Sequence, residues 1–589
     1  MIKHVAFKAE VPMRKWACCL GVLLCCVVSC RPSDFGVKSG ASSWQGEALP
    51  NSFLVSFCPG DGRKFPVTNS FQEEGLYFED LLRTLRSDSR IKMLSFITAM
   101  QNPAEETLHS RLESCSLAAV TRVDFFEAAT ASRMLNEWQK EGRIAFWEPN
   151  WLSRLSKMPQ ANLAKPYLGD GSRWWTDAIQ LGAAIDAIKT TALVDGENAA
   201  SPVLAVLDSG MDVHHPALAD RIWHNPDSAH SPCRHDLWGC NTVDPPDGFL
   251  GEGTAHPYGT QGPGELCEDQ EQGMQGDCIH GTHIAGILAG DVEMGVPGVC
   301  PFCKIMNIRV IEKVGGEGRV PDSAILRALK YLSLFERRPG KNLVRVVNLS
   351  FGKYQKGKAV ALFIEYLAKH RDGILVFAAA GNEDSQKRVY PAAHEPVIAV
   401  TGLAASGRKA SYSNYGPWVN IAAPGGEFRE GRDFAIESSV PGGALALSQG
   451  TSMATPVVAG VAGLLLTVNP ELSLAELRQT ILDAANPAIY DASFAEAYNF
   501  RNYYPELENG KVPLLGVGMV DASAAVRSIK RQESTLKKKE RIQIDCAQIV
   551  TNGGSHESHP LSLLLFFAPL LFVLGWRWRE RLGPYVRDS

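Results

Sequence analysis

Between residues 203 and 466 the chain alternates short apolar runs with longer runs of helical spacing. Runs rich in β-branched residues predict strands at 203–208, 304–310, 344–351, 374–381 and 397–403. Apolar positions at helical spacing predict helices at 321–336, 358–370 and 455–468. Strands that are apolar at nearly every position and alternate with helices are typical of a parallel sheet covered on both faces. We therefore predict an α/β domain with a mostly parallel sheet and helices on both faces, over about residues 165–530.

A smaller mixed pattern precedes this domain. "NSFLVSF" predicts a strand, "FEDLLRTLRS" a helix, and "AATASRMLNEWQKEGRIAFWEPNW" a helix, a glycine turn and a strand. Polar stretches at 31–50 and roughly 153–170 flank it and are typical of linkers. The sequence thus predicts a separate small α+β module at residues 51–152.

Both ends of the chain carry apolar runs next to basic residues. Residues 1–30 have the layout of a secretion signal, with a buried N-terminal helix as the alternative. This run ends in "VVSC", which resembles a bacterial lipoprotein box and makes Cys30 a candidate for lipidation. After a charged linker at 531–558, residues 559–581 predict a membrane span, a cleaved sorting tail or a buried terminal helix. We expect an exported protein associated with a bacterial cell envelope membrane.

Composition narrows the class of protein. The 589 residues are 45% hydrophobic with a net charge of -5, which fits a globular chain of several domains and argues against a nucleic-acid partner. In an exported protein, cysteines close in sequence predict disulfides, and we expect local pairing. The expected pairs are Cys233–Cys240, Cys267–Cys278 and Cys300–Cys303. "CPFC" at 300–303 has a redox or zinc element as its alternative, although a second CxxC is absent.

Four polar residues stand at the ends of predicted elements. Asp208 ends a strand, His280 begins an apolar helix, Asn382 follows a strand, and Ser452 begins another apolar helix. Each has a purely structural alternative: a turn or cap for Asp208 and Asn382, a helix cap for Ser452, and a cap or a metal pair with His283 for His280. Catalytic groups of open parallel sheets gather at the carboxyl ends of strands.

Together these residue types fit one chemistry. A serine hydroxyl needs a base to act as a nucleophile, and an imidazole takes its proton and returns it to the leaving amine. A buried carboxylate orients that imidazole, and an amide N–H₂ stabilises the oxyanion. The chain supplies Asp208, His280, Asn382 and Ser452 in this order.

The motifs around these residues resemble the subtilase family of serine peptidases. They read "AVLDSGMDVHHPAL", "HGTHIAGILAG", "VVNLSFG", "AAAGNED", "YSNYGPWVNIAAPGG", "GTSMATPVVAGVAGLLL" and "GVGMVDASAAV". The order Asp, His, Ser is that of subtilisin, the standard example of this ordering. The resemblance implies Ser452 as nucleophile, His280 as base, Asp208 as orienting acid and Asn382 as oxyanion donor.

The same resemblance implies a self-cleaved inhibitory propeptide at 51–152, with the cut within 150–170. It also places the walls of a specificity pocket at Ser350, Phe351, Gly352, Ala380 and Gly381. Small apolar walls favour a large nonpolar or weakly selective preference, whereas Glu383 near the rim favours a basic side chain. Both interpretations stay open.

The segment between Asp208 and His280 is longer than in compact subtilases. It is rich in Gly, Pro, Cys and acidic residues. Three interpretations are open: the segment restricts substrates, binds calcium, or forms surface loops without a function of their own. No ligand set matches a known calcium site, and no metal or other cofactor is expected for the chemistry. The expected partners are polypeptide substrates, the chain's own propeptide and a membrane. The alternatives are a protease dedicated to processing one partner and an inactive binding module on the same fold.

Overall fold

The structure is a computed structural model of the 589-residue chain. It describes residues 47–56, 88–96, 120–141, 144–155, 173–190, 201–243, 251–252, 279–314, 317–490, 506–507, 510–511 and 513–529. The predictions for residues 1–30 with Cys30, for the helix near 78–87, for Cys267 and Cys278, and for residues 531–581 fall outside these ranges and stay predictions.

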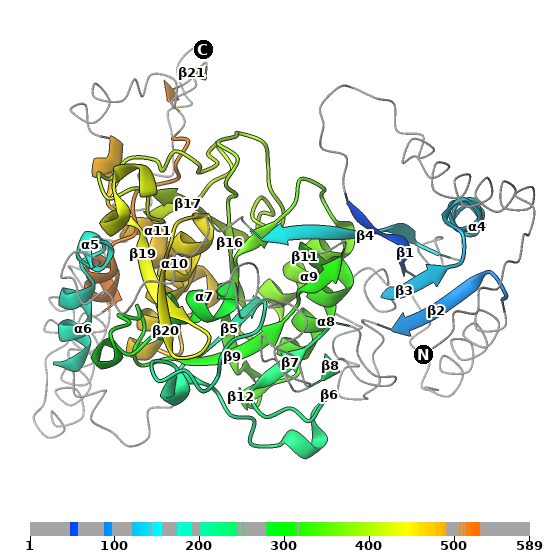
Figure 1. The fold of residues 1–589 in the computed structure, drawn as a ribbon, viewed down its shortest axis with the longest axis horizontal. Helices are drawn as coiled ribbons and strands as arrows, with labels where there is room; N and C mark the ends of the chain where they lie inside the picture. Colours follow the sequence, from blue (N-terminus) through cyan, green and yellow to red (C-terminus); the bar gives the residue numbers. More distant parts are fainter. Residues whose placement is uncertain are drawn as a thin grey trace, which may run out of the picture. The chain divides into compact units, whose positions relative to one another are not determined.

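A mixed, mainly parallel sheet forms the centre of the larger domain (Figure 1). Its five core pairings, from β18 to β9, are all parallel, as the mostly apolar strand patterns predicted. In spatial order the strands are β18 (Ile421–Pro424), β17 (Val397–Leu403), β16 (Leu375–Ala379), β14 (Val344–Leu349), β5 (Val203–Asp208), β9 (Lys304–Arg309), β7 (Gly239–Asn241), β8 (Gly251–Glu252) and β6 (Cys233–Arg234).

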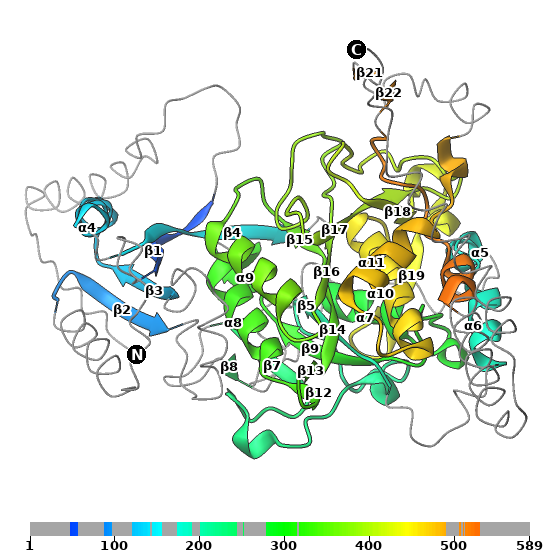
Figure 2. The same ribbon diagram turned by 180° about the vertical axis from the view of Figure 1, so that it is seen from behind.

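Helices cover both faces of this sheet, and each strand contributes alternate side chains to the two cores. In β5, for example, Leu204 and Val206 join one core, whereas Val203, Ala205 and Leu207 join the other. The first face packs on α5 (Trp174–Ala178), α6 (Leu181–Lys189), α7 (His280–Ala289), α10 (Thr451–Val468) and α11 (Leu474–Asp483). The second face packs on α8 (Asp322–Ser333) and α9 (Lys358–Lys369), which Figure 2 shows from behind.

Helix α10 is apolar on nearly all sides because it runs through the first core. It is the one helix of the described residues that is long and apolar enough for a membrane span, with 94% of the 18-residue window buried inside the protein. A helix that is hydrophobic all round is expected in the core of a large domain. Its apolar sequence is therefore explained by tertiary packing.

The N-terminal module is an antiparallel sheet with one described helix. The strand order is β4-β1-β3-β2, and α4 covers a core of its own that includes Phe53, Phe125 and Leu135. Strand β1 begins at Ala48, inside the predicted linker, and β4 continues to Leu155, past the predicted end of the module at 152. The elements are β1 (Ala48–Ser56), β2 (Ile91–Phe96), β3 (Val120–Phe125), α4 (Ala128–Lys140) and β4 (Phe146–Leu155).

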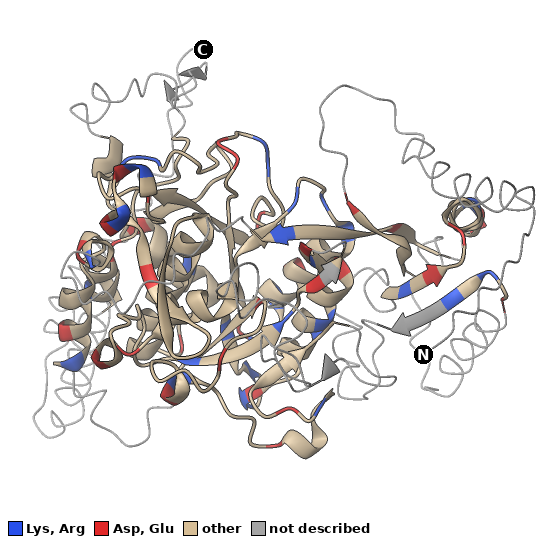
Figure 3. Cartoon of the chain, viewed as in Figure 1, with Lys and Arg blue, Asp and Glu red and all other residues tan. Residues whose placement is uncertain are grey.

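Short strands that the sequence patterns did not predict complete the described fold. They are β10 (Glu312–Val314), β11 (Glu317–Pro321), β12 (Glu336–Arg338), β13 (Lys341–Asn342), β15 (Phe351–Gly352), β19 (Ile436–Val440), β20 (Ala444–Ser448), β21 (Glu506–Leu507) and β22 (Gly510–Lys511). Acidic and basic residues are intermixed along the described elements (Figure 3), in keeping with the small net charge.

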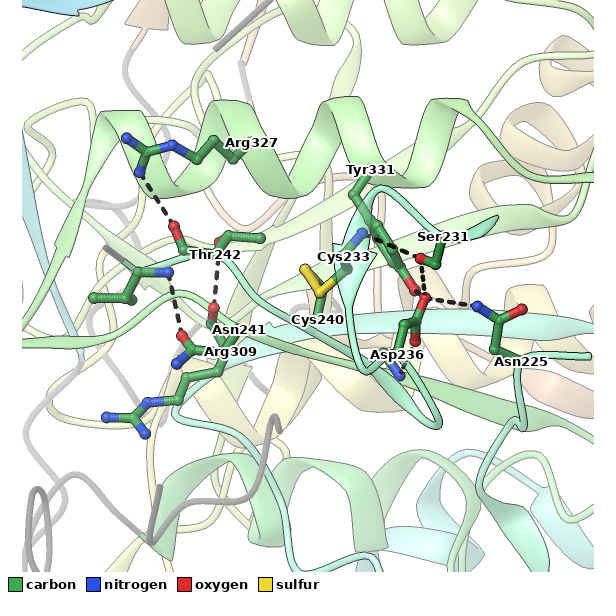
Figure 4. Close-up of a disulfide and its surroundings, with 12 residues drawn as sticks. Asn225, Ser231, Cys233, Asp236, Cys240, Asn241, Thr242, Arg309, Arg327 and Tyr331 are labelled. Carbon is green, nitrogen blue, oxygen red and sulfur yellow. Dashed lines mark hydrogen bonds between the residues drawn. A yellow bond between two sulfur atoms is a disulfide. The ribbon is translucent and has the colours of Figure 1, made fainter. Parts of the chain in front are cut away.

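The Cys233–Cys240 disulfide closes a short loop between β6 and β7 at the edge of the main sheet, and it is one of the predicted pairs (Figure 4). Strand β7 extends the sheet by pairing parallel to β9. The loop is joined to α8 by buried Asp236, whose carboxylate accepts a hydrogen bond of 2.5 Å from the Tyr331 hydroxyl. Burial raises the pKa of Asp236, and burial together with that carboxylate raises the pKa of Tyr331 well above its ordinary value.

The second predicted pair, Cys300–Cys303, lies beneath α10. A Cβ atom at Gly463 would lie 2.6 Å from the Cys303 Sγ, so only glycine lets the helix approach the disulfide this closely. Both cysteines are buried, which places "CPFC" in the core as a disulfide rather than as a zinc ligand pair.

Replacing Cys233 and Cys240 together by alanine is expected to lower the free energy of unfolding by about 2.5 kcal/mol, the entropy of closing such a short loop. Urea unfolding of the oxidised wild-type and variant proteins measures the difference. Equal unfolding midpoints would contradict a stabilising role of the disulfide and would favour the hydrogen bonds of Asp236 as the contacts that hold this loop.

Candidate active site

The structure places all four candidate residues where chain segments enter or leave the main sheet and its helices. Asp208 is the last residue of β5, and His280 is the first residue of α7. Asn382 follows β16, and Ser452 lies in the first turn of α10. Asp208, His280 and Ser452 are at most 1% exposed.

Asp208 and His280 form a hydrogen-bonded pair. The His280 Nδ1 atom lies 2.8 and 2.9 Å from the two carboxylate oxygens of Asp208, and the Ser209 N–H donates to the same carboxylate at 2.7 Å. The Gly281 N–H donates to the Ser209 hydroxyl, and a Cβ atom at Gly281 would lie 2.1 Å from the Gly210 carbonyl oxygen. A glycine after His280 therefore lets α7 begin close enough to β5 for this pair to form.

Ser452 is held by two reciprocal hydrogen bonds with Ser350. The Ser452 hydroxyl donates to the Ser350 carbonyl, and the Ser350 hydroxyl donates to the Ser452 carbonyl, both at 3.0 Å. The second bond replaces one that the helix lacks, because Pro456 has no N–H to donate to the carbonyl four residues before it. The Asn348 side-chain amide donates to the Ser350 hydroxyl at 3.0 Å and so orients it.

The hydrogen bond between Ser452 and His280 is not formed in this structure. The His280 Nε2 atom is buried and has no hydrogen-bond partner, while the Ser452 hydroxyl points to Ser350. With Nδ1 committed to Asp208, Nε2 is the imidazole nitrogen left to accept a proton. Such bonds often tighten only when a substrate is bound.

Asn382 lies against the start of α10. Its Oδ1 atom accepts from the Thr451 N–H at 2.9 Å and from the Thr451 hydroxyl at 2.8 Å. These bonds turn the Nδ2 group toward Gly450, where a Cβ atom would lie 3.0 Å from it. The Asn382 amide and the backbone nitrogen of Ser452 thus lie close together beside Gly450, an arrangement suited to binding a negative charge.

The alternative of a metal pair made by His280 and His283 does not fit the contacts. His280 binds Asp208, and the His283 Nε2 atom lies 3.0 Å from the Ala446 carbonyl oxygen. Burial lowers the pKa of His283 to about 3, so this imidazole is neutral at physiological pH. Among the described residues no group of three or more His, Cys, Asp or Glu side chains is placed to hold a metal ion.

The predicted pocket walls are brought together with the helix start. Ser350 contacts Ser452, and the Gly381 N–H donates to the Thr451 hydroxyl at 3.1 Å. The sequence analysis did not single out Asn414, which joins the second wall to the loop after it. Its side-chain amide donates to the Ala380 carbonyl and to the Glu383 carboxylate, at 2.9 and 2.7 Å. Asn414 belongs to the motif "YSNYGPWVNIAAPGG", but nothing in the residue pattern distinguishes it from its neighbours.

Strand β4 of the N-terminal module lies between two short strands of the larger domain. It pairs antiparallel with β11 on one side, where Val320 is opposite Ser153, and with β15 on the other, where Phe351 is opposite Leu155. Because β15 follows Ser350 directly, the described end of β4 lies next to the segment that holds Ser452. The sequence pattern predicted a linker from residue 153 on. The strand continues to Leu155 because its pairing partners lie far away in the sequence.

Two side chains of β4 also cap helices of the larger domain. The Glu148 carboxylate accepts from the N–H groups of Lys358 and Ala359 at the start of α9, both at 2.9 Å. Asn150 does the same for α8, accepting from the Ser323 N–H at 3.0 Å. Helix starts present unpaired N–H groups, which these side chains satisfy.

A buried charge cluster accompanies these caps. The Asp322 carboxylate pairs with the Lys353 ammonium group, and both side chains are buried. Burial and the charge of Asp322 raise the pKa of Glu148, and burial raises the pKa of Asp322 while Lys353 opposes that shift. The contact between the module and the domain is therefore strongly polar at this point.

Comparisons with known proteins place the larger domain in a family. The family model "Subtilase family" matches residues 199–513, more than half of the chain. Subtilisin BL from Lederbergia lenta is 31% identical over 249 residues, covering 42% of this chain and 77% of that protein. A thermophilic serine proteinase from Bacillus sp. (strain AK1) is 27% identical over 445 residues, 74% of this chain and 90% of the other. A solved protease structure from Pseudoalteromonas arctica matches 62% of this chain and 99% of its own at 24% identity, with a TM-score of 0.45.

The chain is a member of the subtilase family, as the sequence motifs predicted. Its α/β fold agrees with that membership, and it is a subtilisin-like serine endopeptidase acting on polypeptides.

The bond from Ser350 to the Ser452 carbonyl gives a prediction about stability. Ser350→Ala leaves that buried carbonyl unpaired and is expected to cost about 1–3 kcal/mol of unfolding free energy. Pro456→Ala restores an N–H at the position that can donate to the same carbonyl. The double variant is therefore expected to be less destabilised than the sum of the single ones, measured by urea unfolding. Strict additivity would contradict the idea that the serine replaces the missing N–H.

Proposed function

We propose that the chain is an exported subtilisin-like endopeptidase in which Ser452 is the nucleophile and His280 the general base. Asp208 orients the imidazole, and Asn382 stabilises the oxyanion through its Nδ2 group. The observation that carries this assignment is the hydrogen-bonded pair of Asp208 and His280, which leaves the buried Nε2 atom as the only imidazole nitrogen available to the reaction.

In the proposed reaction the Ser452 Oγ atom attacks the carbonyl carbon of the scissile peptide bond. Its proton passes to His280 Nε2, and the charge that forms on the imidazole is stabilised by Asp208. The carbonyl oxygen becomes an oxyanion that the Asn382 side chain and the N–H of Ser452 bind. His280 then protonates the leaving amine, which leaves an acyl ester on Ser452. A water molecule that His280 activates in the same way hydrolyses this ester and restores the serine.

We also propose that the N-terminal module is an inhibitory propeptide removed by this same site. Three contacts support the proposal: the pairing of β4 between β11 and β15, and the caps that Glu148 and Asn150 place on two helices. A peptide that adds a strand to exposed strands is a recurring way to bind an extended substrate.

The register of β4 favours one position for the cut. Arg154 is opposite Gly352 and Leu155 is opposite Phe351, so the described pairing ends one position short of Ser350. Ser350 is the residue whose carbonyl accepts the Ser452 hydroxyl. We therefore expect cleavage after Ser156, inside the range of 150–170 predicted from the sequence.

Ser452→Ala is expected to abolish peptidase activity, labelling by a fluorophosphonate and removal of the module, because one hydroxyl serves all three. Ser473→Ala, which changes an exposed helix cap, is the matched control and is expected to retain them. Intact mass and N-terminal sequencing of the wild-type protein are expected to give a mature form that begins at Lys157. Maturation of purified Ser452→Ala protein would refute self-cleavage, and a start far from 157 would refute the register argument.

The buried charge cluster of Glu148, Asp322 and Lys353 predicts that the stability of the uncleaved precursor depends on pH. The pKa of Glu148 is raised in the folded protein, so the folded state binds more protons than the unfolded state above the ordinary glutamate pKa. This contribution to stability is complete below that ordinary value, about 4.3, and is lost as the pH rises through the raised pKa. Asp322 acts in the same direction.

Urea unfolding of the Ser452→Ala precursor between pH 4.5 and 8 tests this prediction. Adding Glu148→Gln is expected to reduce the fall in unfolding free energy with rising pH. Each tenfold increase in the proton affinity of Glu148 on folding contributes about 1.4 kcal/mol to the fall, and Glu148→Gln is expected to remove this contribution. Glu365→Gln, an exposed glutamate of α9, is the control and should leave the slope unchanged. An unchanged slope in Glu148→Gln would contradict the direction in which its pKa is moved.

Export is proposed on the signal-like residues 1–30 and is supported by the two disulfides, which persist in oxidising compartments. Lipidation at Cys30, the C-terminal span or sorting tail, and a calcium requirement remain proposals from the sequence. A protease dedicated to one partner is the second candidate, favoured by the long segment between Asp208 and His280.

A further inference from the structure

A side chain that the sequence motifs did not single out lies between the two predicted pocket walls. Val389 lies in the segment between β16 and β17 and is 4% exposed. A Cβ atom placed on Gly352 would lie 2.4 Å from its Cγ1 atom, and one placed on Gly381 would lie 3.3 Å from its Cγ2 atom. The two methyl groups of Val389 therefore face the two glycines that form the opposite walls.

Val389 is held in this place by its neighbours. The next residue, Tyr390, pairs with Lys353 by two backbone hydrogen bonds of 2.9 and 2.7 Å, and Lys353 follows Gly352 directly. The Ala393 N–H donates to the Val389 carbonyl at 2.8 Å. These backbone hydrogen bonds fix the point from which the Val389 side chain extends toward the two glycines.

Glu383 closes the same pocket from the side. Its Oε2 atom would lie 2.7 Å from a Cβ atom on Gly381, and it accepts from the Asn414 amide at 2.7 Å. The carboxylate also accepts from Tyr354, whose pKa burial and Glu383 raise to about 12. With two donors already bound, Glu383 does not depend on a substrate cation for its hydrogen bonds.

We propose that Val389 fills the floor of the pocket for the residue before the scissile bond, and so limits that residue to the size of glycine, alanine or serine. This inference rests on the proposed function, since it concerns the same site. It departs from both preferences drawn from the sequence, because a large nonpolar or a basic side chain needs the space that the valine occupies. It agrees with cleavage after Ser156, which was derived from the register of β4 alone.

The test is a series of peptide substrates that differ only at the residue before the scissile bond, with alanine, serine, leucine, phenylalanine and arginine. For the wild-type protein we expect kcat/KM to be highest for alanine or serine. Val389→Ala is expected to raise the ratio for phenylalanine over alanine at least about tenfold, and Val389→Gly about a hundredfold, as for other changes of pocket size.

Val360→Ala is the matched control, because it removes the same two methyl groups from a buried valine of α9. It is expected to lower stability without changing the ratio. Two variants at Val389 are used so that one poorly folded protein does not decide the result. A wild-type preference for leucine, phenylalanine or arginine, or an unchanged ratio in both Val389 variants, would overturn the inference while the proposed function stands. Absence of any Ser452-dependent hydrolysis in the mature wild-type protein would overturn both.

Discussion

The position of Ser452 depends on a hydrogen bond that its own helix does not make. Pro456 removes the N–H that would pair with the Ser452 carbonyl, and the Ser350 hydroxyl donates to it instead. Ser350 follows the last residue of β14, so this bond ties the start of α10 to the central sheet. The return bond from the Ser452 hydroxyl to the Ser350 carbonyl makes the contact reciprocal. The first pocket wall and the candidate nucleophile are thereby held as one unit.

Much of the fold followed from the sequence because its patterns are local. Runs such as 203–208 and 397–403 are apolar at nearly every position, and they became parallel strands buried on both faces. The motifs also placed Asp208, His280, Asn382 and Ser452 at element ends, where the structure has them. What the motifs did not give was the rotation of the Ser452 hydroxyl toward Ser350, which depends on a partner 102 residues away.

The features that the sequence did not reveal all depend on distant partners. Strand β4 extends through Leu155 because β11 and β15 supply its hydrogen bonds, whereas the residues themselves have a polar, linker-like pattern. Val389 has no distinguishing neighbours in sequence, and its position between Gly352 and Gly381 emerges only when β15 and the segment after β16 lie side by side. Asp236 likewise gains its role from Tyr331, 95 residues away.

The polar contacts of the N-terminal module are suited to the removal proposed for it. The module has a hydrophobic core of its own, built from residues such as Phe53 and Leu135, so its folding does not rest only on the larger domain. Its contacts with that domain include backbone pairing, two helix caps and a buried charge cluster. On the proposed removal of the module, water replaces hydrogen bonds of this kind at a small net cost for each bond. The interface also has an apolar part, because four residues of the module belong to the hydrophobic cluster of α8 and α9: Leu54, Val120, Phe146 and Leu155. Removal would therefore expose the domain's share of this apolar surface.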